Sequence, residues 1–533
     1  MRFFFAECEN EYSFDLMKEL SDRHGFTISH VSSHFFRFSE GDMRKLPVFK
    51  DTMVVDSRTF YAVDTLSAAY GQYFILLDKE IIEYFQEIEC DFYALTDRYN
   101  YKSIPFSARK RLFRDLIRFW LGFLQKEGVE AVYFGGTPHS LGEIVLMRAC
   151  HYLRIPIAFL GYTQINNRSL LRPYYDALPK VPNDYLPGKS TAEITALTDA
   201  ELLKDVNEDS MATHVTRAAN DQFHGQVGAN TNDKFLDIGQ CRKSETLVTR
   251  LKDLIKPLYY KIFSPRSVPV FEIAISLDKD RDLASWRRAI LEHRRSALKL
   301  KNYHDSLVEE NLDLTKPYIY YPMHLQPEMT SQPEAMVFDD HLLALETLLK
   351  VLPEGWLIYI KENPRQYDPT INLVSALHFR DKHDLDSLVT RHKDRVRLVP
   401  QRLKTEMLIG NCKTVVTLTG TAGWEALNLG KTCLTFAYPW YSPCASCFIV
   451  QTPDEVRAAL LALADKTPDA VARDRAAYLH FYQQALFVGT PSDPLSVTFN
   501  TRPYADLLRL HSAELAAYYK HRNSSNIAQH YAA

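Results

Sequence analysis

The sequence has few cysteines and no long apolar run. Its 533 residues include eight cysteines at scattered positions, several of them inside apparent core segments. This distribution is typical of reduced thiols and argues against a disulfide framework, so we expect a cytoplasmic protein. No run is long and apolar enough to span a bilayer, and the opening MRFFFAECE turns acidic too soon for a signal peptide.

Neither sign of charge is in excess. The chain has 63 lysines and arginines against 66 aspartates and glutamates, which gives a net charge of -3. This balance offers no support for nucleic-acid binding. With 46% hydrophobic and 24% charged residues, the composition is that of an ordinary globular protein, and the length predicts two large domains or three smaller ones.

Several motifs of known chemistry are missing as well. No G-x-G-x-x-G follows the first strand of either half, which argues against a dinucleotide oxidoreductase, and the absence of G-x-x-x-x-G-K-[ST] argues against a P-loop enzyme. The H-E-x-x-H pair of zinc proteases is absent too. Cys444 and Cys447 form a single C-x-x-C without a second pair, so we predict packing thiols there and no metal site.

What the sequence contains is an alternation of strand-like and helix-like segments. In the N-terminal half, strands are predicted at 2–6, 26–31, 73–77, 131–134 and 157–160. In the C-terminal half, they are predicted at 318–321, 356–360, 396–399, 414–418 and 432–437. Helical patterns lie between most of them, which is typical of parallel βαβ units. We therefore predict an α/β protein of two Rossmann-like, doubly wound domains that face a cleft.

The predicted domains are separated by a less regular region. We predict an N-terminal domain over 1–165, a partly irregular insertion with two basic helices over 166–310, a C-terminal domain over 311–490, and a helix with a tail over 491–533. One basic helix is expected over 244–263. The other, over 284–307, carries Arg287, Arg288, Arg294, Arg295, Lys299 and Lys301. A solvated helix face is the simpler interpretation, and contact with an acidic polymer or anionic lipid is the alternative.

The most informative stretch, 414–437, has the pattern of strand, tight turn, short helix and strand. The turn contains Thr419, Gly420 and Thr421, of which the threonines can cap the helix and the glycine lets the backbone approach a ligand. Unpaired N–H groups at a helix N-terminus form an anion site, so we predict a phosphate seat for a nucleotide. The alternative is an ordinary βαβ turn whose glycines, Gly420 and Gly423, are needed for packing.

Two further polar loops follow strands of the C-terminal half. They contain His324, Gln326 and Glu328 in one and Lys361, Asn363 and Arg365 in the other. Because the carboxyl ends of parallel strands meet at one edge, we expect these loops and the turn to share one binding site. The cations can neutralise phosphate oxygens, the amides can hold a hydroxyl, phosphate or ribose, and the histidine and glutamate are candidate acid–base groups. The alternative is a loop ion pair between His324 and Glu328 with a solvated Lys361.

Two other residues have open interpretations. His139 ends the turn at 135–140 in the N-terminal half. It is either a general base or acceptor contact that reaches across the cleft, or a helix-start histidine bonded to backbone. Glu425 lies in the first turn of a helix, where the dipole favours an acid in any case, so we interpret it as structural.

Three quoted segments carry a family resemblance. They are YIYYPMHLQPE (318–328), IKENPRQ (360–366) and TLTGTAGWEALNLGKTCLTFA (417–437). In this order and spacing they resemble bacterial capsular polysaccharide biosynthesis proteins, the group that includes Kdo-transferase-like glycosyltransferases. The resemblance implies a GT-B enzyme with two Rossmann-like domains. The C-terminal domain would hold a nucleotide-sugar donor, the N-terminal domain would bind the acceptor, and no obligatory metal or cofactor would be needed.

The resemblance also implies roles for individual residues. His324, Gln326 and Glu328 would line the cleft beside the donor. Lys361 and Asn363 would lie at the nucleotide phosphate or ribose, while Thr419, Gly420 and Thr421 would seat the phosphate. Related enzymes with CMP-activated donors often have His-Pro where this chain has Asn363-Pro364. Asparagine carries no positive charge, which argues against a CMP-sugar and leaves Lys361 or His324 to supply the charge.

We therefore expect a metal-independent glycosyltransferase with His139, His324 and Glu328 as catalytic residues. It would move a sugar from a nucleotide-sugar to a glycan or lipid-linked acceptor at the inner face of the cytoplasmic membrane. Peripheral membrane contact or a polysaccharide-assembly complex would be a further partner. The alternatives are a nucleotide-sugar epimerase, a CDP-polyol phosphotransferase, and a non-catalytic relative that binds glycan or acts as a scaffold.

Overall fold

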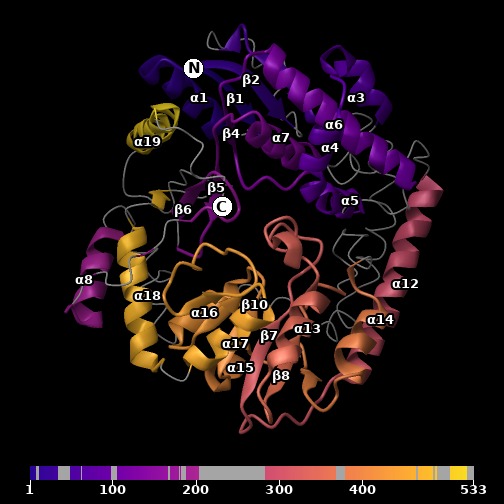
Figure 1. Ribbon diagram of the computed structural model, residues 1–533, viewed down its shortest axis with the longest axis vertical. Helices are drawn as coiled ribbons and strands as arrows, with labels where there is room; N and C mark the ends of the chain where they lie inside the picture. Colours follow the sequence, from indigo (N-terminus) through magenta and orange to yellow (C-terminus); the bar gives the residue numbers. More distant parts are fainter. Residues whose placement is uncertain are drawn as a thin grey trace, which may run out of the picture. The chain divides into compact units, whose positions relative to one another are not determined.

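The computed structural model describes residues 1–7, 11–33, 49–61, 63–97, 105–165, 168–178, 181, 186, 188–202, 283–367, 379–463, 466–483, 486–488 and 504–524 (Figure 1). The chain divides into two compact units. The N-terminal unit contains residues 1–177 together with the C-terminal residues from 485 onward. The C-terminal unit contains most of the remainder up to residue 484.

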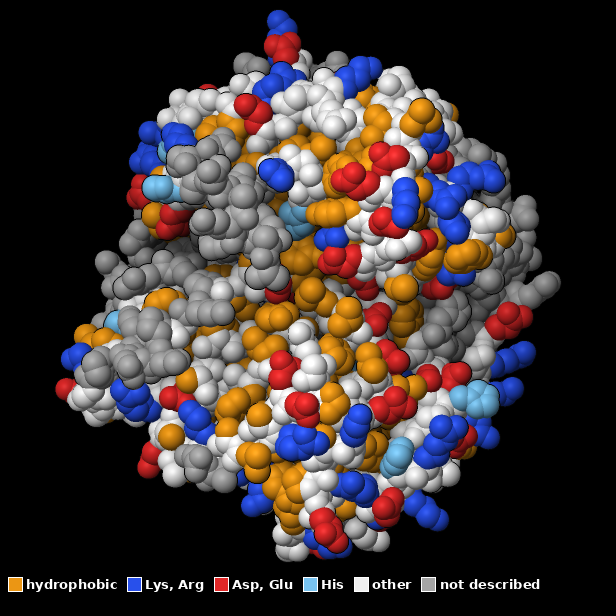
Figure 2. All heavy atoms as spheres, viewed as in Figure 1, with side chains coloured by type: hydrophobic (Ala, Val, Ile, Leu, Met, Phe, Trp, Pro, Cys, Tyr) orange, Lys and Arg blue, Asp and Glu red, His pale blue; other side chains and the backbone are white. Residues whose placement is uncertain are grey.

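The surface carries both signs of charge. Acidic and basic side chains are interspersed over the face shown in Figure 2, in keeping with the small net charge of the sequence. Within the described ranges, no helix combines the length and the apolar character that a membrane span requires.

The N-terminal unit is built on a seven-stranded sheet of order β13-β6-β5-β4-β1-β2-β3. The strands are β1 (Arg2–Ala6), β2 (Thr27–Ser33), β3 (Met53–Asp56), β4 (Ala131–Phe134), β5 (Ile157–Tyr162), β6 (Arg168–Arg172) and β13 (Leu486–Val488). Strands β1 to β5 pair in parallel, whereas β6 is antiparallel to both β5 and β13. The helices assigned to this unit are α1 (Glu11–His24), α3 (Val63–Tyr70), α4 (Lys79–Phe85), α5 (Glu89–Asp97), α6 (Phe106–Lys126), α7 (Leu141–Tyr152) and α19 (Tyr504–Ser524).

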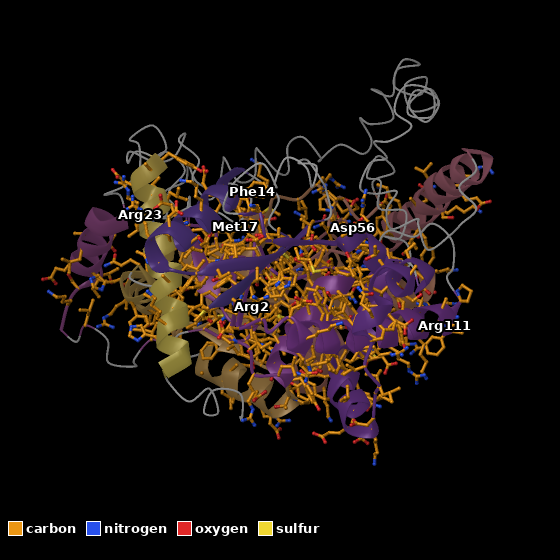
Figure 3. All side chains as sticks on the ribbon, turned by 90° about the horizontal axis from the view of Figure 1, so that it is seen from above. Arg2, Phe14, Met17, Arg23, Asp56 and Arg111 are labelled. Atoms are coloured by element: carbon orange, nitrogen blue, oxygen red, sulfur yellow. The ribbon has the colours of Figure 1, made fainter. Side chains whose placement is uncertain are left out.

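Helices cover both faces of this sheet. Phe3 of the central strand β1 packs in one cluster with Met17 of α1, which Figure 3 labels, and with Tyr519 of α19. On the other face, the Phe4 ring lies 5.7 Å from Trp120 of α6. A sheet buried on both faces needs strands that are apolar at every position, as β1 is from Phe3 to Ala6.

The C-terminal helix α19 belongs to the N-terminal unit. Its Tyr519 hydroxyl donates to the carbonyl of Val132 in β4 at 2.6 Å, and its Tyr518 hydroxyl donates to the carbonyl of Ile157 in β5 at 2.8 Å. The sequence analysis set 491–533 apart from both domains, because helical periodicity alone does not indicate which sheet a helix covers.

The C-terminal unit has a six-stranded, fully parallel sheet of order β12-β11-β10-β7-β8-β9. Its strands are β7 (Tyr318–Pro322), β8 (Leu357–Lys361), β9 (Val396–Leu398), β10 (Thr414–Thr417), β11 (Cys433–Thr435) and β12 (Cys447–Ile449). Its helices are α8 (Thr191–Leu202), α12 (Leu283–Leu307), α13 (His341–Val351), α14 (Lys382–Leu385), α15 (Thr405–Asn411), α16 (Thr421–Asn428), α17 (Pro453–Ala462) and α18 (Pro468–Tyr482).

The order of this sheet reverses between β7 and β10. From β7 the chain proceeds through β8 and β9 to one edge and then returns to build β10, β11 and β12 on the other side. One face packs against α13 and α17 around Ile319 and Ile360, while Tyr318 on the other face donates its hydroxyl to the Leu408 carbonyl of α15. A reversal of this kind leaves a crevice at the carboxyl ends of the two adjacent strands, where ligands bind in open α/β sheets.

The predicted α/β class with two mostly parallel sheets is confirmed. The helix predicted over 284–307 is α12, and the one predicted over 244–263 lies outside the described residues. On α12, Arg295 and Lys299 are exposed and Lys301 pairs with Asp305 at 2.5 Å. The side chains of Arg287, Arg288 and Arg294 are outside the description, so membrane contact through this helix stays a prediction.

The strand predicted over 73–77 is wrong. The segment runs along helix α6 instead, where the N–H of Ile75 donates to the carbonyl of Arg118 at 3.4 Å and the Ile75 carbonyl accepts from Arg118 Nε at 3.0 Å. The approach is close because α6 has a glycine there. A Cβ on Gly122 would lie 1.8 Å from the backbone oxygen of Tyr73.

Replacing Gly122 with alanine therefore has to displace the backbone of this segment. We expect Gly122→Ala to lower the free energy of unfolding by about 1–3 kcal/mol, measured by urea denaturation, because the colliding atom is main chain. Gly71→Ala is the matched control, since a Cβ at Gly71 meets nothing within 4 Å. Equal stability of the two variants would contradict this packing.

Candidate functional site

A polar cluster joins the carboxyl ends of β7 and β10. His324 follows β7, and its Nε2 lies 3.1 Å from Oγ1 of Thr417, the last residue of β10. The N–H of Thr419 in the next turn points at the same ring nitrogen, at 3.4 Å. The imidazole therefore bridges the two strands at which the sheet order reverses.

The hydrogen bonds of His324 fix its tautomer. The Thr330 hydroxyl donates to Glu328, so its oxygen is left to accept from His324 Nδ1 at 3.3 Å. Nδ1 therefore carries the proton, and Nε2 is the acceptor that faces Thr419. Burial, with the Arg380 charge adding to it, lowers the pKa of His324 to about 4. The ring is neutral near pH 7 and does not supply the positive charge that the sequence analysis considered for it.

A second histidine holds the start of this loop. The His324 N–H donates to Nε2 of His341 at 3.2 Å, and Nδ1 of His341 lies 2.8 Å from the Tyr321 hydroxyl. Because Nε2 accepts, Nδ1 must carry the proton and donate to Tyr321. Burial is the main cause that holds the pKa of His341 well below its usual range, so this ring is also neutral.

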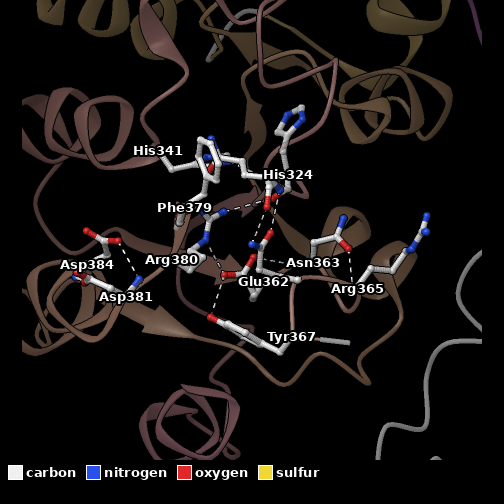
Figure 4. Close-up of polar contacts among 12 residues, drawn as sticks. His324, His341, Glu362, Asn363, Arg365, Tyr367, Phe379, Arg380, Asp381 and Asp384 are labelled. Atoms are coloured by element: carbon white, nitrogen blue, oxygen red, sulfur yellow. Dashed lines mark hydrogen bonds and ion pairs between the residues drawn. The ribbon is translucent and has the colours of Figure 1, made fainter. Parts of the chain in front are cut away.

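A buried ion pair ties the loop after β7 to the loop after β8 (Figure 4). Arg380 Nε contacts Glu362 Oε2 at 2.9 Å, and the two side chains are 3% and 0% exposed. The same guanidinium donates to the Gln326 side chain and, at 3.2 Å, to the His324 carbonyl. Removing one partner of a buried pair typically costs about 3–5 kcal/mol, because the other charge is left uncompensated.

Gln326 is held from several sides. Its backbone N–H donates to Gln366 Oε1 at 2.8 Å, and Gln366 Nε2 donates back to the Gln326 carbonyl at 2.9 Å. Its side-chain amide donates to the carbonyl of Asp339 at 2.6 Å and accepts from Arg380. In this structure Gln326 thus fixes the path of the loop after β7.

Lys361 is directed at a neighbouring turn. Its ammonium donates to the Leu403 carbonyl and to Thr405 Oγ1, the latter at 3.3 Å. Burial lowers the pKa of Lys361 to about 8, and the carboxylates of Glu425 and Glu406 oppose that shift.

Asn363 and Arg365 form a turn at the end of β8. The Asn363 side-chain oxygen accepts from the N–H of Arg365 at 2.9 Å, the contact of an Asx turn. The Asn363 N–H donates to Glu362 Oε1 at 2.9 Å. Arg365 is exposed, and Figure 4 shows its side chain apart from the contacts of Arg380.

The turn after β10 begins helix α16 with Gly420 at the cap position. The threonines that we expected to cap the helix bond elsewhere, since Thr419 donates to the Thr330 carbonyl and Thr421 donates to Glu425 Oε1 at 3.2 Å. The Gly420 N–H donates to Thr417 Oγ1 at 3.1 Å. The N–H groups of Thr421 and Ala422 then come first in the helix, where backbone donors have no partner within the helix itself.

Both glycines of this turn pack closely against side chains. A Cβ on Gly420 would lie 2.6 Å from Thr417 Oγ1, and a Cβ on Gly423 would lie 2.2 Å from the Tyr441 hydroxyl. That hydroxyl donates to the Gly420 carbonyl. The packing role that the sequence left open for these glycines is therefore present in the structure.

His139 belongs to the N-terminal unit, at the start of α7. Its Nδ1 donates to the Thr137 carbonyl at 2.7 Å, and its backbone N–H donates to Glu143 at 3.1 Å. Ser140 and Glu143 form a capping box around the same turn. These are the backbone contacts of a helix-start histidine, which was one of the two interpretations of the sequence.

Four side chains that organise the cluster are not predicted from the sequence. They are His341, Glu362, Arg380 and Tyr441. Arg380 lies in a polar stretch that resembles a surface loop, and its partner Glu362 is 18 residues away. No local pattern indicates such a contact. The one usable signal is the position of Glu362, directly after the buried strand β8, where a carboxylate has to be either exposed or paired.

The depressed pKa of Lys361 predicts a dependence of stability on pH. The folded value of about 8 lies below the reference value of 10.5, so the unfolded chain binds this proton more tightly. The free energy of unfolding is therefore lowered most below pH 8, and this loss disappears as the pH rises from 8 to 10.5. Between pH 7 and about 9.5, wild type should gain about 2 kcal/mol in unfolding free energy relative to Lys361→Met.

Denaturation at the two pH values measures this difference. Lys404→Met, which removes an exposed lysine from the adjacent turn, is the control. The account fails if the gain relative to Lys361→Met is absent, or if Lys404→Met gives the same gain.

Comparison with known proteins identifies one segment. Residues 338–444 match the family model described as "Capsule polysaccharide biosynthesis protein". The segment contains most of the cluster, including Glu362, Arg380 and the turn from Thr419 to Thr421. No curated protein matches the chain in sequence.

Solved structures give only distant likenesses. The KpsC β-Kdo 2,7-transferase of Thermosulfurimonas dismutans is 15% identical over 32% of this chain and 55% of its own, with a TM-score of 0.19. The KpsC β-Kdo 2,4-transferase of the same organism is 13% identical over 66% of this chain and 80% of its own, with a TM-score of 0.26. A putative UDP-N-acetylglucosamine 2-epimerase of Listeria monocytogenes is 10% identical over 98% of this chain and 97% of its own, with a TM-score of 0.23.

This chain thus spans about half the length of the first of these structures. At such identities and scores the likenesses carry no argument about function. The family match confirms the resemblance at two of its three segments, 360–366 and 417–437, and residues 338–444 are similar to the capsule polysaccharide biosynthesis protein family.

Proposed function

We propose that this protein is a glycosyltransferase of capsule polysaccharide biosynthesis that uses a nucleotide-sugar as donor. The observation that carries the proposal is the contact of His324 with Thr417 and Thr419, at the place where the order of the C-terminal sheet reverses. It brings the loop after β7 against the start of α16, and α16 lies inside the family segment. A ligand at this edge of the sheet meets both loops at once.

The start of α16 is the proposed phosphate site. The N–H groups of Thr421 and Ala422 begin the helix, and the helix dipole adds partial positive charge at the same place. Thr421 is an exposed residue, so its side chain is accessible to a ligand. Its hydroxyl donates to Glu425 Oε1, which puts that carboxylate within reach of a hydroxyl such as those of a ribose. Here the proposal departs from our structural interpretation of Glu425.

The departing nucleotide would be stabilised mainly by these dipoles. His324 is neutral, Arg380 is committed to Glu362 and its neighbours, and the Lys361 ammonium is bound to the turn before α15. Helix N–H groups at the phosphate are preorganised donors and need no reorganisation as charge develops on the leaving oxygen. Arg365, exposed at the end of β8, is the cation that we propose for the outer phosphate oxygens.

The remaining roles are proposals of the same kind. Glu328 is half-buried and accepts from Thr330, which itself bonds to His324, so we assign it the acid–base role at the donor. We propose that a glycan or lipid-linked acceptor binds the N-terminal unit near His139, at the inner face of the cytoplasmic membrane. Contact with the membrane or with an assembly complex through α12 is part of this proposal.

Thermal stabilisation by CMP, CDP, UDP and GDP tests the donor site. We expect one of the four to raise the melting temperature of wild type and to have little effect on Thr421→Val or Gly420→Ala. The first change removes a hydroxyl at the proposed phosphate, and the second pushes a methyl group against Thr417. Thr347→Val is the control, because Thr347 bonds within α13.

A shift that survives both site variants would contradict the proposed site. No shift with any nucleotide would favour the non-catalytic alternative. Once the donor nucleotide is known, mass spectrometry of the products distinguishes a glycosyltransferase from an epimerase and a phosphotransferase. Release of the nucleotide with a sugar added to an acceptor supports a transferase. An unchanged mass after conversion of the sugar nucleotide alone would indicate an epimerase, and a polyol phosphate on the acceptor would indicate a phosphotransferase.

A further inference from the structure

Arg380 is the buried charge around which the cluster is arranged. Its guanidinium contacts the Glu362 carboxylate, the Gln326 side chain and the His324 carbonyl, and it also donates to the carbonyl of Phe379 at 2.7 Å. Only 3% of the side chain is exposed. Figure 4 shows the guanidinium of Arg380 directed toward His324 and Glu362. Two of these acceptors, the Gln326 side chain and the His324 carbonyl, belong to the loop that carries His324.

We propose that Arg380 is a positioning residue that holds the His324 ring, through the His324 carbonyl and the Gln326 side chain, with Nε2 turned to the Thr417–Gly420 turn. The proposal rests on the function proposed above, because it assigns this ring to the nucleotide site. It adds a residue that touches neither the proposed phosphate site nor the proposed acid–base group.

The geometry of the fork explains why an arginine is needed. One planar guanidinium reaches acceptors in two loops with all three nitrogens. Nε donates to Glu362, Nη2 donates to the His324 carbonyl, and Nη1 donates to both Gln326 and the Phe379 carbonyl. A lysine carries a single nitrogen and cannot reach all of them in these directions. The His341 contact to the His324 N–H and the Arg380 contact to the His324 carbonyl fix the two peptide groups on either side of the His324 Cα, so the side chain leaves the backbone in one direction.

The charge of Arg380 acts on the same ring. Besides burial, Arg380 is the group that lowers the pKa of His324, and it also lowers the pKa of His341. Among the described residues, two other ionisable groups lie near the ring. His341 accepts from the backbone N–H of His324, and Glu328 accepts from the Thr330 hydroxyl that contacts the ring. Glu362 lies beyond the guanidinium and offsets part of its charge. Without Arg380, the His324 ring should take up a proton more readily and lose its Nε2 acceptor.

The test measures the protonation of the His324 ring directly. Nitrogen NMR of ¹⁵N-histidine protein, assigned with His324→Gln, gives the tautomer of His324 and the midpoint of its titration. We expect wild type to show a bare Nε2 and a midpoint of about 4. In Arg380→Met combined with Glu362→Gln, which removes both buried charges, we expect the midpoint to move toward 6.5 and the single tautomer to be lost.

Arg380→Lys separates charge from geometry. It keeps the cation and loses the fork, so the midpoint should stay low while the tautomer becomes mixed and the nucleotide-induced thermal shift falls at least about twofold. Arg395→Met is the control, because Arg395 also donates to two loop carbonyls, those of Leu352 and Pro353, in the same unit. It should leave the His324 signals and the nucleotide shift unchanged.

The outcomes separate the two proposals. If the Arg380 variants fold and the His324 signals stay as in wild type, Arg380 has only a structural role and the inference is overturned. The same holds if Arg395→Met changes the His324 signals equally. If wild type responds to no nucleotide, the proposed function fails, and the His324 signals still decide whether Arg380 positions the ring.

Discussion

The contact of the neutral His324 ring with the turn after β10 is the interaction on which the site depends. It joins the two strands at which the order of the C-terminal sheet reverses. A polar group in that position has to be fully bonded, because an unsatisfied donor or acceptor costs about 1–3 kcal/mol when buried. Thr330, Thr417 and Thr419 meet this requirement at the ring, while His341 and Arg380 hold the backbone of the same residue.

The proposed phosphate site has little positive charge available to it. Unlike the exposed Arg365, Arg380 and Lys361 are bonded inside the protein, Arg380 to Glu362 and Lys361 to the Leu403 carbonyl. They shape the loops, and they leave the helix N-terminus at Thr421 as the preorganised donor at the edge of the sheet. A buried ion pair such as that of Arg380 and Glu362 costs desolvation energy. Here Arg380 also holds the loop after β7 in place.

The sequence predicted the fold well and the site only in part. Apolar strands such as 318–321 and 356–360, separated by helical periods, are enough to predict parallel α/β sheets, because both faces of such sheets are buried. The edge that carries His324 and Thr419 follows from the same pattern. The roles of Lys361, Gln326 and Arg380 do not follow, because they depend on contacts with residues 40 or more positions away. The sequence does not indicate which sheet helix α19 covers for the same reason, since its partner strands lie several hundred residues earlier.

Hydrogen–deuterium exchange with and without the nucleotide that stabilises the protein tests the central claim most directly, because it reports backbone N–H groups. A nucleotide phosphate at the start of α16 should slow exchange in peptides that cover residues 419–425. The loop at 324–330 should be protected as well, since His324 and Thr419 are bonded to each other. Protection confined to other parts of the chain, with residues 419–425 unchanged, would contradict the account.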